Sequence, residues 1–430
     1  MDTYNIWTIG CQMNKADSER LGSALDQMSL SSVESPELAD VIVVNSCVVR
    51  KSAEDKVTGM LAKLNGFKKN NPDQIIALMG CMVGPKQDKL QKQFPFVDVF
   101  MRPQEYDPLL QLIGVKTGID PDGCVGDLTA TPGVTAFIPI IHGCDKFCSF
   151  CIIPYRRGRE VSRTIADIVR ETELLVARGV KEITLLGQNV DSYGHDFDEK
   201  RDLADLLIAL NDVNNLKRIR FLTSHPNDMS DHIIDTVAQL DKVCEHINLP
   251  FQAGDDDVLE RMRRGYTNKQ YRLLVDKIRN RIPTVSMSTD LIVGFSGETA
   301  EQFEKSVEMV KDMKFDKVHS ASYSVREGTI ASRTLPDDVS FEEKKARLKT
   351  IDDLQKDIQE NLNSKLNGTI QSVLVENIKN DILEGRTKND KIVRLSGVGN
   401  SIGEIVEVKI QKTGPWSLSG LIVNPLEVLI

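Results

Sequence analysis

The first hundred residues alternate short apolar runs with longer polar or amphipathic stretches. The apolar runs are IWTI (6–9), VIVV (41–44) and IIALM (75–79). The stretches that follow the first two runs, 15–28 and 51–64, have the pattern of helices. Uniformly apolar strands separated by helices are typical of a parallel sheet that is covered on both faces. The pattern predicts an N-terminal parallel α/β domain over residues 1–120.

From about Val134 to Val325, further apolar segments alternate with amphipathic helices such as 165–179 and 300–313. These segments are 134–141, 182–187, 217–223, 246–250, 284–294 and 316–324. Repeated strand–helix units favour a (β/α) barrel, and these units are too few to close the usual barrel of about eight. We therefore expect a central partial (β/α)6 barrel within residues 130–364, with an open side for a large substrate.

The pattern changes again near the C-terminus. A charged amphipathic helix is predicted over 341–366, and the residues after it are strand-rich, with Gly and Asn turns between the strands. The predicted strands are 369–378, 391–397, 404–413 and 421–430. Short strands separated by turns are typical of a small β-barrel. The chain is thus predicted to be α/β overall, with a small C-terminal β-barrel at 366–430.

Composition narrows the class of protein. The chain of 430 residues is 40% hydrophobic and 27% charged, which is ordinary for a globular protein of several domains. Its net charge of −9 argues against non-specific nucleic-acid binding through the whole surface, but not against a local basic patch. No apolar run is long enough to cross a bilayer, and the first residues lack the pattern of a signal peptide. We expect a cytoplasmic protein without a membrane partner, whose cysteines are metal ligands or reactive thiols.

Three cysteines occupy the same position relative to a predicted strand. Cys11, Cys47 and Cys81 each lie two or three residues after an apolar run. Because the carboxyl ends of parallel strands gather ligands, these three thiols are expected to converge in space. The alternative for each is a buried small hydrophobic residue, a common role for cysteine. Cys124 and Cys244 have no comparable setting, and we expect that plain role for both.

Three more cysteines, Cys144, Cys148 and Cys151, follow the first predicted barrel strand within eight residues. Structural zinc usually has four ligands in two short-spaced pairs, and here only His142 is near enough in sequence to be a fourth. Closely spaced thiolates suit iron–sulfur clusters. Three thiolates on a four-iron cluster leave one iron open to bind a small molecule.

The spacing C-x3-C-x2-C at the end of a first barrel strand resembles the radical S-adenosylmethionine (SAM) superfamily. The resemblance implies that a [4Fe–4S] cluster at Cys144, Cys148 and Cys151 chelates SAM through its open iron. One electron then cleaves SAM to a 5′-deoxyadenosyl radical. Chemistry of this kind requires the protein mainly to orient the reactants and to exclude water.

Longer stretches resemble one family of that superfamily, the methylthiotransferases. They are GCQMNKADSE (10–19), NSCVVRKSAEDKV (45–57), GC (80–81), GCDKFCSFCIIPYRRGREVSR (143–163), LLGQNV (185–190), LPFQAGDDDVLERMRRGYT (249–267) and DLIVGFSGET (290–299). The C-terminal β domain resembles the TRAM module of the same enzymes, so the resemblance covers essentially the whole chain. The QMN and VRKSAEDKV stretches resemble the MiaB branch, which acts on isopentenylated adenosine beside the tRNA anticodon. Ser296 stands where the family usually has proline.

The resemblance also implies roles for particular residues. Cys11, Cys47 and Cys81 would hold a second [4Fe–4S] cluster, whose open iron carries the sulfur that one SAM methylates. The radical from a second SAM would then help to replace C2–H of N6-isopentenyladenosine at tRNA position 37 with C2–SCH3. Gln188 and Asp290 are implied SAM contacts, the alternative being solvated strand-end residues. The implied partners are the tRNA anticodon stem-loop and an electron donor such as a flavodoxin-type protein; the sulfur donor is left open.

Basic side chains near the predicted open end of the barrel are candidates for contact with RNA phosphates. They are Arg156, Arg157, Arg159, Arg163, Arg261, Arg263 and Arg264. The alternative for them is a solvated surface position beside an acidic residue. His225 follows the third barrel strand, as a functional or a plain turn residue. Residues 366–430 carry seven basic and seven acidic residues, so RNA contact there requires an uneven charge distribution or base stacking.

Other functions are compatible with parts of this pattern. One is a methylthiotransferase of another branch, which acts on a threonylcarbamoyl-type tRNA adenosine or on a ribosomal-protein aspartate. Another is a zinc-binding RNA adaptor without catalysis, which analysis of iron and acid-labile sulfide would distinguish. A third, a radical SAM enzyme without sulfur insertion, would not need the three N-terminal cysteines.

Overall fold

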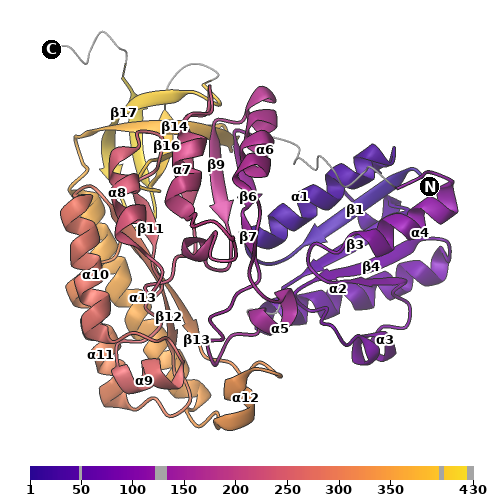
Figure 1. Ribbon diagram of the computed structural model, residues 1–430, viewed down its shortest axis with the longest axis horizontal. Helices are drawn as coiled ribbons and strands as arrows, with labels where there is room; N and C mark the ends of the chain where they lie inside the picture. The colour runs from indigo at the N-terminus through magenta and orange to yellow at the C-terminus, as the bar shows by residue number, and fades with distance from the viewer. Residues whose placement is uncertain (48–50, 122–132, 397–400, 424–430) are drawn as a thin grey trace.

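The computed structural model describes residues 1–47, 51–121, 133–396 and 401–423. Its sheets form three successive parts: an open parallel sheet, a partial barrel and a small closed barrel (Figure 1). Cys124 lies outside the described residues. Among the described helices, none is both long and apolar enough to span a membrane.

The N-terminal part is a parallel five-stranded sheet in the order β2-β1-β3-β4-β5. The predicted strands and helices are confirmed, and two short edge strands, β2 and β5, were not predicted. The elements are β1 (Thr3–Thr8), α1 (Gln12–Gln27), β2 (Ser31–Ser32), β3 (Val41–Ser46), α2 (Lys51–Asn70), β4 (Ile75–Gly80), α3 (Asp88–Gln93), β5 (Val99–Met101) and α4 (Asp107–Thr117).

Both faces of this sheet are buried, which explains the uniformly apolar runs. On β3, Val41 and Val43 belong to one core, which α1 and α4 complete. Ile42 and Val44 belong to a second core on the other face, which α2 completes. Because successive side chains of a strand point to opposite faces, a strand covered on both faces is apolar at every position.

The central part has six parallel strands in two three-stranded sheets, ordered β10-β9-β6 and β11-β12-β13. All six predicted barrel strands are confirmed. The strands are β6 (Thr135–Pro139), β9 (Glu182–Leu186), β10 (Arg218–Phe221), β11 (His246–Asn248), β12 (Ser286–Val293) and β13 (Lys317–Ser322). A short hairpin, β7 (Ile141–His142) and β8 (Val161–Ser162), follows the first of them.

Helices follow the strands of the central part, and most of them cover the outside of the two sheets. They are α5 (Ile153–Arg157), α6 (Ile165–Ala177), α7 (Leu203–Asn211), α8 (Asp231–Gln239), α9 (Asp256–Arg261), α10 (Asn268–Arg281), α11 (Ala300–Met313), α12 (Ile330–Thr334) and α13 (Phe341–Ser364). Local sequence fixes several of their starts. Thr299, for example, accepts a hydrogen bond from the backbone of Gln302, whose side chain accepts one in return, a capping box that begins α11.

The C-terminal part is a closed barrel of five strands in the order β14-β15-β16-β18-β17. Its strands are β14 (Ile370–Lys379), β15 (Ile382–Thr387), β16 (Ile392–Ser396), β17 (Ile405–Thr413) and β18 (Leu418–Ile422). The small β-barrel is confirmed, but β15 was not predicted because its sequence, ILEGRT, is largely polar. The strand predicted at 421–430 overlaps the end of β18 at residues 421–422, and 424–430 lie outside the described residues.

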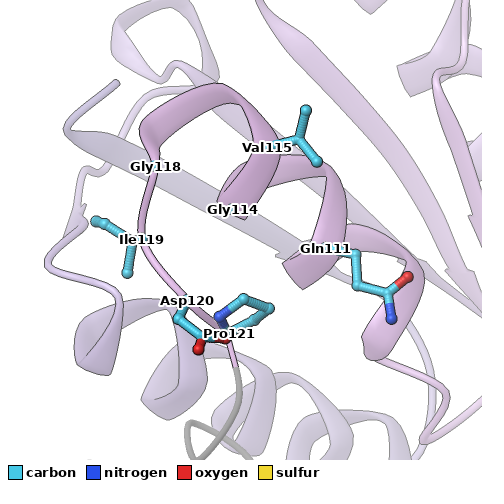
Figure 2. A pocket seen from close by; sticks show the side chains of 7 residues that line it. All are labelled: Gln111, Gly114, Val115, Gly118, Ile119, Asp120 and Pro121. Atoms are coloured by element: carbon cyan, nitrogen blue, oxygen red, sulfur yellow. The ribbon is translucent and has the colours of Figure 1, made fainter.

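A pocket lies at the C-terminal end of α4 and in the turn that follows (Figure 2). It is lined by Gln111, Gly114, Val115, Gly118, Ile119, Asp120 and Pro121. Because α4 runs back from the end of β5, this pocket lies at the edge of the sheet opposite the carboxyl ends of the strands. Ligands of open α/β sheets gather at those carboxyl ends, so we assign the pocket no part in the candidate site.

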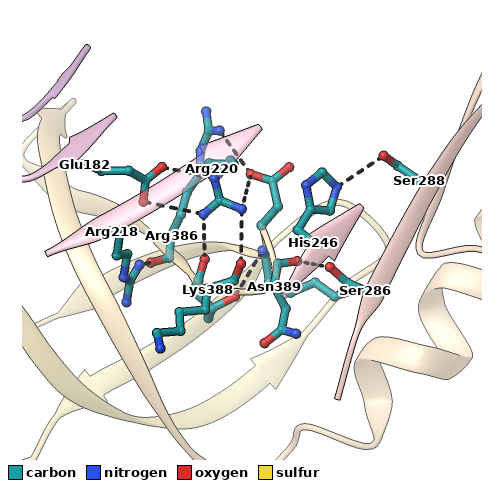
Figure 3. Close-up of polar contacts among 12 residues, drawn as sticks. Glu182, Arg218, Arg220, His246, Ser286, Ser288, Arg386, Lys388 and Asn389 are labelled. Carbon is teal, nitrogen blue, oxygen red and sulfur yellow. Dashed lines mark hydrogen bonds and ion pairs between the residues drawn. The ribbon is translucent and has the colours of Figure 1, made fainter. Parts of the chain in front are cut away.

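The turn between β15 and β16 docks on the amino-terminal ends of the barrel strands (Figure 3). Arg220, on β10, donates hydrogen bonds to the carbonyl oxygens of Thr387 and Lys388, at 3.3 and 3.0 Å. Its Nε donates to Glu182, the first residue of β9, at 3.0 Å, and both side chains are only 3% exposed. Cys244 is fully buried nearby, as expected of a plain core residue.

Further hydrogen bonds extend this contact to the neighbouring strands. Arg218, the first residue of β10, donates to the carbonyl oxygens of Arg386 and Ser372, at 2.6 and 3.1 Å. Ser286, the first residue of β12, donates to the carbonyl oxygen of Asn389 at 2.9 Å. The small barrel therefore closes the amino-terminal end of the partial barrel and leaves the opposite end for chemistry.

We predict that Arg220→Met loosens the small barrel, because it leaves the Glu182 carboxylate buried without its partner. Breaking one side of a buried ion pair should lower the free energy of unfolding by about 3–5 kcal/mol. Chemical denaturation measures that loss, and hydrogen exchange should show faster exchange in β15 and β16. Arg394→Met, on β16, is the matched control, since Arg394 is 58% exposed and lies 3.9 Å from Glu384. Equal exchange in the two variants would contradict the assignment.

Candidate functional site

Cys11, Cys47 and Cys81 follow β1, β3 and β4, at the carboxyl edge of the parallel sheet. Adjacent strands remain joined past their ends: the amide of Cys81 donates to the carbonyl oxygen of Ser46 at 3.0 Å. Burial raises the pKa of Cys81 to about 11, and the charges of Cys11 and Cys47 add to that rise. The structure thus brings together three thiols that are far apart in sequence.

A glycine makes the close approach of these thiols possible. Gly10 has a φ of +146°, and a Cβ at this position would lie 2.8 Å from the Cβ of Cys47. Any larger residue would therefore push the Cys11 turn away from Cys47.

Buried asparagines hold the Cys11 turn against β3. The side chain of Asn14 donates to Asn45 Oδ1 and to the carbonyl oxygen of Ser46, both at 2.9 Å. Asn45 in turn donates to the carbonyl oxygen of Asn14 and to Ser18 Oγ, both at 2.8 Å. A buried polar network that is satisfied in this way specifies one arrangement. This network gives Asn14, the last residue of the QMN stretch, a structural role beside Cys11.

The second set of thiols lies in the loop between β7 and α5. Cys148 is buried, whereas Cys144 and Cys151 are partly exposed. The loop is fixed by Ser149, whose hydroxyl donates to the carbonyl oxygen of Arg261 at 2.6 Å. Arg264 donates from Nη1 to the sulfur of Cys148 at 3.2 Å. Sequence reasoning did not find this contact, because the RMRRG segment is more than a hundred residues away.

The chemistry of the thiols fits a metal cluster. Burial raises the pKa of Cys144 and of Cys151 to about 12, so both are protonated at neutral pH unless a cation binds them. Ligands of a single zinc ion lie about 2.3 Å from it, which requires sulfurs in close contact. In the part of the chain that the structure describes, no three His, Cys, Asp or Glu residues are arranged to hold one metal ion. Sets of three cysteine thiolates suit iron–sulfur clusters, in which several irons share the ligands.

The two implied SAM contacts lie on different sheets. Gln188 follows β9, and its Oε1 is buried without a hydrogen-bond donor among the described residues. Asp290 lies within β12 and not after it, and its Oδ2 accepts a hydrogen bond from Asn248 at 3.3 Å. An orphaned buried oxygen such as that of Gln188 fits a polar ligand that completes its hydrogen bonds.

Several polar residues cluster around His225, and of these the sequence pattern indicated only His225 itself. His225 is 4% exposed, so it is not a solvated turn residue. Its amide donates to Asp191 at 3.0 Å, and its Nε2 is buried without a partner among the described residues. Burial raises the pKa of Asp191 to about 7. Asp228 joins this group to the cysteine loop, since it accepts from both Lys146 and Asn189.

Near both thiol sets, residues of the N-terminal part and of the barrel pack against each other. Met13, two residues after Cys11, belongs to a small separate apolar cluster with Ala16 and Leu186. Leu186 ends β9 and lies two residues before Gln188. From the other side, Ile152 is buried in the N-terminal core. In Figure 1, α5 lies against the N-terminal part although it belongs to the barrel sequence.

The prediction that seven arginines meet RNA phosphates is wrong for at least two of them. Arg157 and Arg264 are 6% and 5% exposed, because both serve the cysteine sites from within. Arg163 is paired with Glu171 at 2.6 Å, and Arg261 donates to the carbonyl oxygen of Ser296. The remaining three are Arg156, which is partly buried, and Arg159 and Arg263, which are exposed.

Three family models match the chain. The model described as the radical SAM superfamily matches residues 138–310. The one described as uncharacterized protein family UPF0004 matches residues 3–102, and the TRAM domain model matches 364–423. The fold and the two cysteine sets thus define a radical SAM protein with an added N-terminal cysteine domain and a TRAM domain.

Curated relatives are similar over nearly their whole length. A tRNA-2-methylthio-N(6)-dimethylallyladenosine synthase of Dehalococcoides mccartyi (strain CBDB1) is 48% identical over 99% of this chain and 100% of its own. Proteins of the same name from Herpetosiphon aurantiacus and Thermoanaerobacter pseudethanolicus are 45% and 39% identical, over 98% of this chain and 97% and 93% of theirs. The chain therefore belongs to the MiaB-type family of radical SAM methylthiotransferases.

A solved structure supports the fold alone. The radical SAM methyltransferase TsrM from Kitasatospora setae, with cobalamin and a [4Fe–4S] cluster bound, matches with a TM-score of 0.58. It is 14% identical, and the match covers 86% of this chain and 81% of that one.

We predict that His225 makes the stability of the protein depend on pH. Burial and the charges of Arg264 and Lys146 lower the pKa of His225 from 6.5 to about 2. Below pH 6.5 the unfolded chain binds a proton at His225 that the folded chain does not, so stability falls as the pH drops. Each pH unit in that window costs about 1.4 kcal/mol.

His225→Gln should therefore gain about 2 kcal/mol relative to the unchanged chain between about pH 7.5 and pH 5. Chemical denaturation at the two pH values measures the difference. His232→Gln is the control, because His232 is 53% exposed. A difference between the His225 variant and the unchanged chain that does not vary with pH would contradict the argument.

Proposed function

We propose that this chain converts N6-isopentenyladenosine at position 37 of tRNA to its 2-methylthio derivative. The observation that carries the proposal is identity over full length to synthases named for that product, on a chain that keeps both cysteine sets. C2 of adenine carries no acidic proton and no leaving group, so polar substitution is a poor route and radical chemistry is a sensible one.

Membership of this family implies SAM and [4Fe–4S] clusters as cofactors. We assign one cluster to Cys144, Cys148 and Cys151 and the other to Cys11, Cys47 and Cys81, and this assignment is supported by the proximity of the thiols within each set. When bound, the clusters and two SAM molecules would supply the radical and the sulfur. The chain itself would orient SAM through Gln188 and Asp290, and the buried Gln188 oxygen supports that role.

The tRNA would approach the carboxyl end of the partial barrel with its anticodon stem-loop. Support comes from the small barrel, which closes the other end of the strands. Trp416, in the turn between β17 and β18, is 59% exposed, and an exposed aromatic ring can stack on an unpaired base. Base stacking would allow the TRAM domain to bind RNA without net positive charge.

The proposal also includes the domain bounds, the electron donor and the location in the cell. Domain bounds of 1–120, 130–364 and 366–430 are supported by the ends of α4 at Thr117 and of α13 at Ser364. Reductive cleavage requires an external electron, for which a flavodoxin-type protein is the proposed donor. A cytoplasmic location agrees with a tRNA substrate and with thiols that must stay reduced.

One experiment tests both the separate roles of the two cysteine sets and the branch of the family to which the chain belongs. The anaerobically reconstituted chain should hold about eight irons with sulfide, if each set carries one four-iron cluster. With reductant, SAM and isopentenylated tRNA it should yield both 5′-deoxyadenosine and the methylthio nucleoside. The Cys11, Cys47 and Cys81→Ala triple variant should lose the methylthio product and keep some 5′-deoxyadenosine, since the radical arises at the other cluster.

Three outcomes would overturn parts of this proposal. Full methylthio product from the triple variant would return Cys11, Cys47 and Cys81 to the role of core residues. Zinc in place of iron and sulfide would favour a non-catalytic adaptor. Product with threonylcarbamoylated tRNA and none with isopentenylated tRNA, measured by nucleoside mass analysis, would assign the chain to another branch.

A further inference from the structure

Arg157 belongs to the barrel sequence, but its side chain lies in the N-terminal part. It is the last residue of α5, six residues after Cys151. Its Nη2 donates to Oδ2 of Asp17, on α1, at 2.9 Å. The exposed fraction of the Arg157 side chain is 2%, and that of Asp17 is 0%. The segment that carries one set of thiols therefore places a buried cation beside the other set.

The hydrogen bonds of this ion pair are incomplete. Among the described residues, Nη1 of Arg157 and Oδ1 of Asp17 are buried without a partner. Burying a charged group with an unmade hydrogen bond is costly unless another group completes it. Besides Asp17, Cys81 and Cys11 act on the charge of Arg157, and they do so when they are thiolates, as in a metal cluster. An acceptor at these thiols would fit the orphaned Nη1.

The position of Arg157 is fixed by its neighbours rather than by its own ion pair alone. Ile152 is buried in the core of the N-terminal part. Arg156, the residue before Arg157, packs so closely on Gly84 that a Cβ at position 84 would lie 1.9 Å from Arg156 Nη1. Arg102 donates to the carbonyl oxygen of Arg156 at 3.3 Å. Contacts of the residues just before Arg157 thus help to hold it at the edge that carries Cys81.

A parallel contact exists at the other set of thiols. Arg264, also buried, donates from Nη1 to Cys148 at 3.2 Å and from Nη2 to the carbonyl oxygen of Pro250 at 3.2 Å. Each set of thiols therefore has one buried arginine next to it. The difference is that Arg264 serves its own domain, whereas Arg157 crosses to the neighbouring one.

A four-iron cluster on three thiolates has a net negative charge, which becomes larger on reduction. A nearby guanidinium stays charged at every accessible pH and offers several donors. Hydrogen bonds to cluster sulfurs and nearby charge set the reduction potential of such clusters. We propose, resting on the function proposed above, that Arg157 is a positioning residue that donates to a sulfur of the cluster at Cys11, Cys47 and Cys81 and raises its reduction potential.

The test measures the midpoint potential of that cluster by redox titration with EPR detection. The full chain with Cys144, Cys148 and Cys151→Ala isolates its signal. In this background Arg157→Met should shift the midpoint to lower potential, because no nearby guanidinium then stabilises the negative charge that reduction adds. Asp17→Asn should shift it the other way, because the guanidinium then acts without its carboxylate. Arg159→Met, two residues on and 75% exposed, is the matched control and should leave the potential unchanged.

Opposite shifts in the two variants would support the proposal, since a purely structural role does not predict opposite signs. Unchanged potentials, or shifts of the same sign, would overturn it. If Arg157→Met fails to hold iron, Arg157→Lys decides: retention of the cluster at near the original potential supports the charge argument, and loss of iron in both leaves Asp17→Asn as the deciding variant. A chain without any cluster at Cys11, Cys47 and Cys81 would refute the proposed function instead, before Arg157 is tested.

Discussion

The buried ion pair between Arg157 and Asp17, with the packing of Ile152 and Arg156 beside it, joins the two cysteine sites. A buried pair of this kind adds little net stability, because desolvation offsets most of the attraction. It does fix geometry, since neither charge can leave its partner without a large penalty. The segment from Cys144 to Arg157 therefore has two roles: its thiols form one site, and its last residue is buried beside the other. The two sites cannot separate without breaking this pair.

The two ends of the partial barrel have different roles. At the amino-terminal ends of the barrel strands, Arg218 and Arg220 bind the backbone of the β15–β16 hairpin, which closes that end. At the carboxyl ends lie the thiols, the orphaned oxygen of Gln188 and the buried His225. Barrel proteins place stability at one end and chemistry at the other for the same reason: loops at the carboxyl ends vary freely while the strands stay packed.

Much of this was readable in the sequence, because it rests on local pattern. The strands β3 and β4 begin with runs that are apolar at every position, 41–44 and 75–79, and the two cysteine sets have regular places after strands. The predictions that were wrong concern residues whose partners are distant in the sequence. Arg157 and Arg264 look like surface arginines until α1 and the cysteine loop pack over them. The strand β15 was not predicted because, of its buried positions Leu383, Gly385 and Thr387, only the first is a large apolar residue. Closure of the barrel, more than local hydrophobicity, makes it a strand.

The central claim is that the segment from Cys144 to Arg157 holds the two proposed cluster sites close to each other. Pulsed EPR of the reduced, reconstituted chain tests it directly, because two nearby paramagnetic clusters interact through their dipoles. We expect a dipolar interaction in the unchanged chain that disappears when either set of three cysteines is replaced by alanine. A spectrum of the unchanged chain that equals the sum of the spectra of the two triple variants would contradict the account.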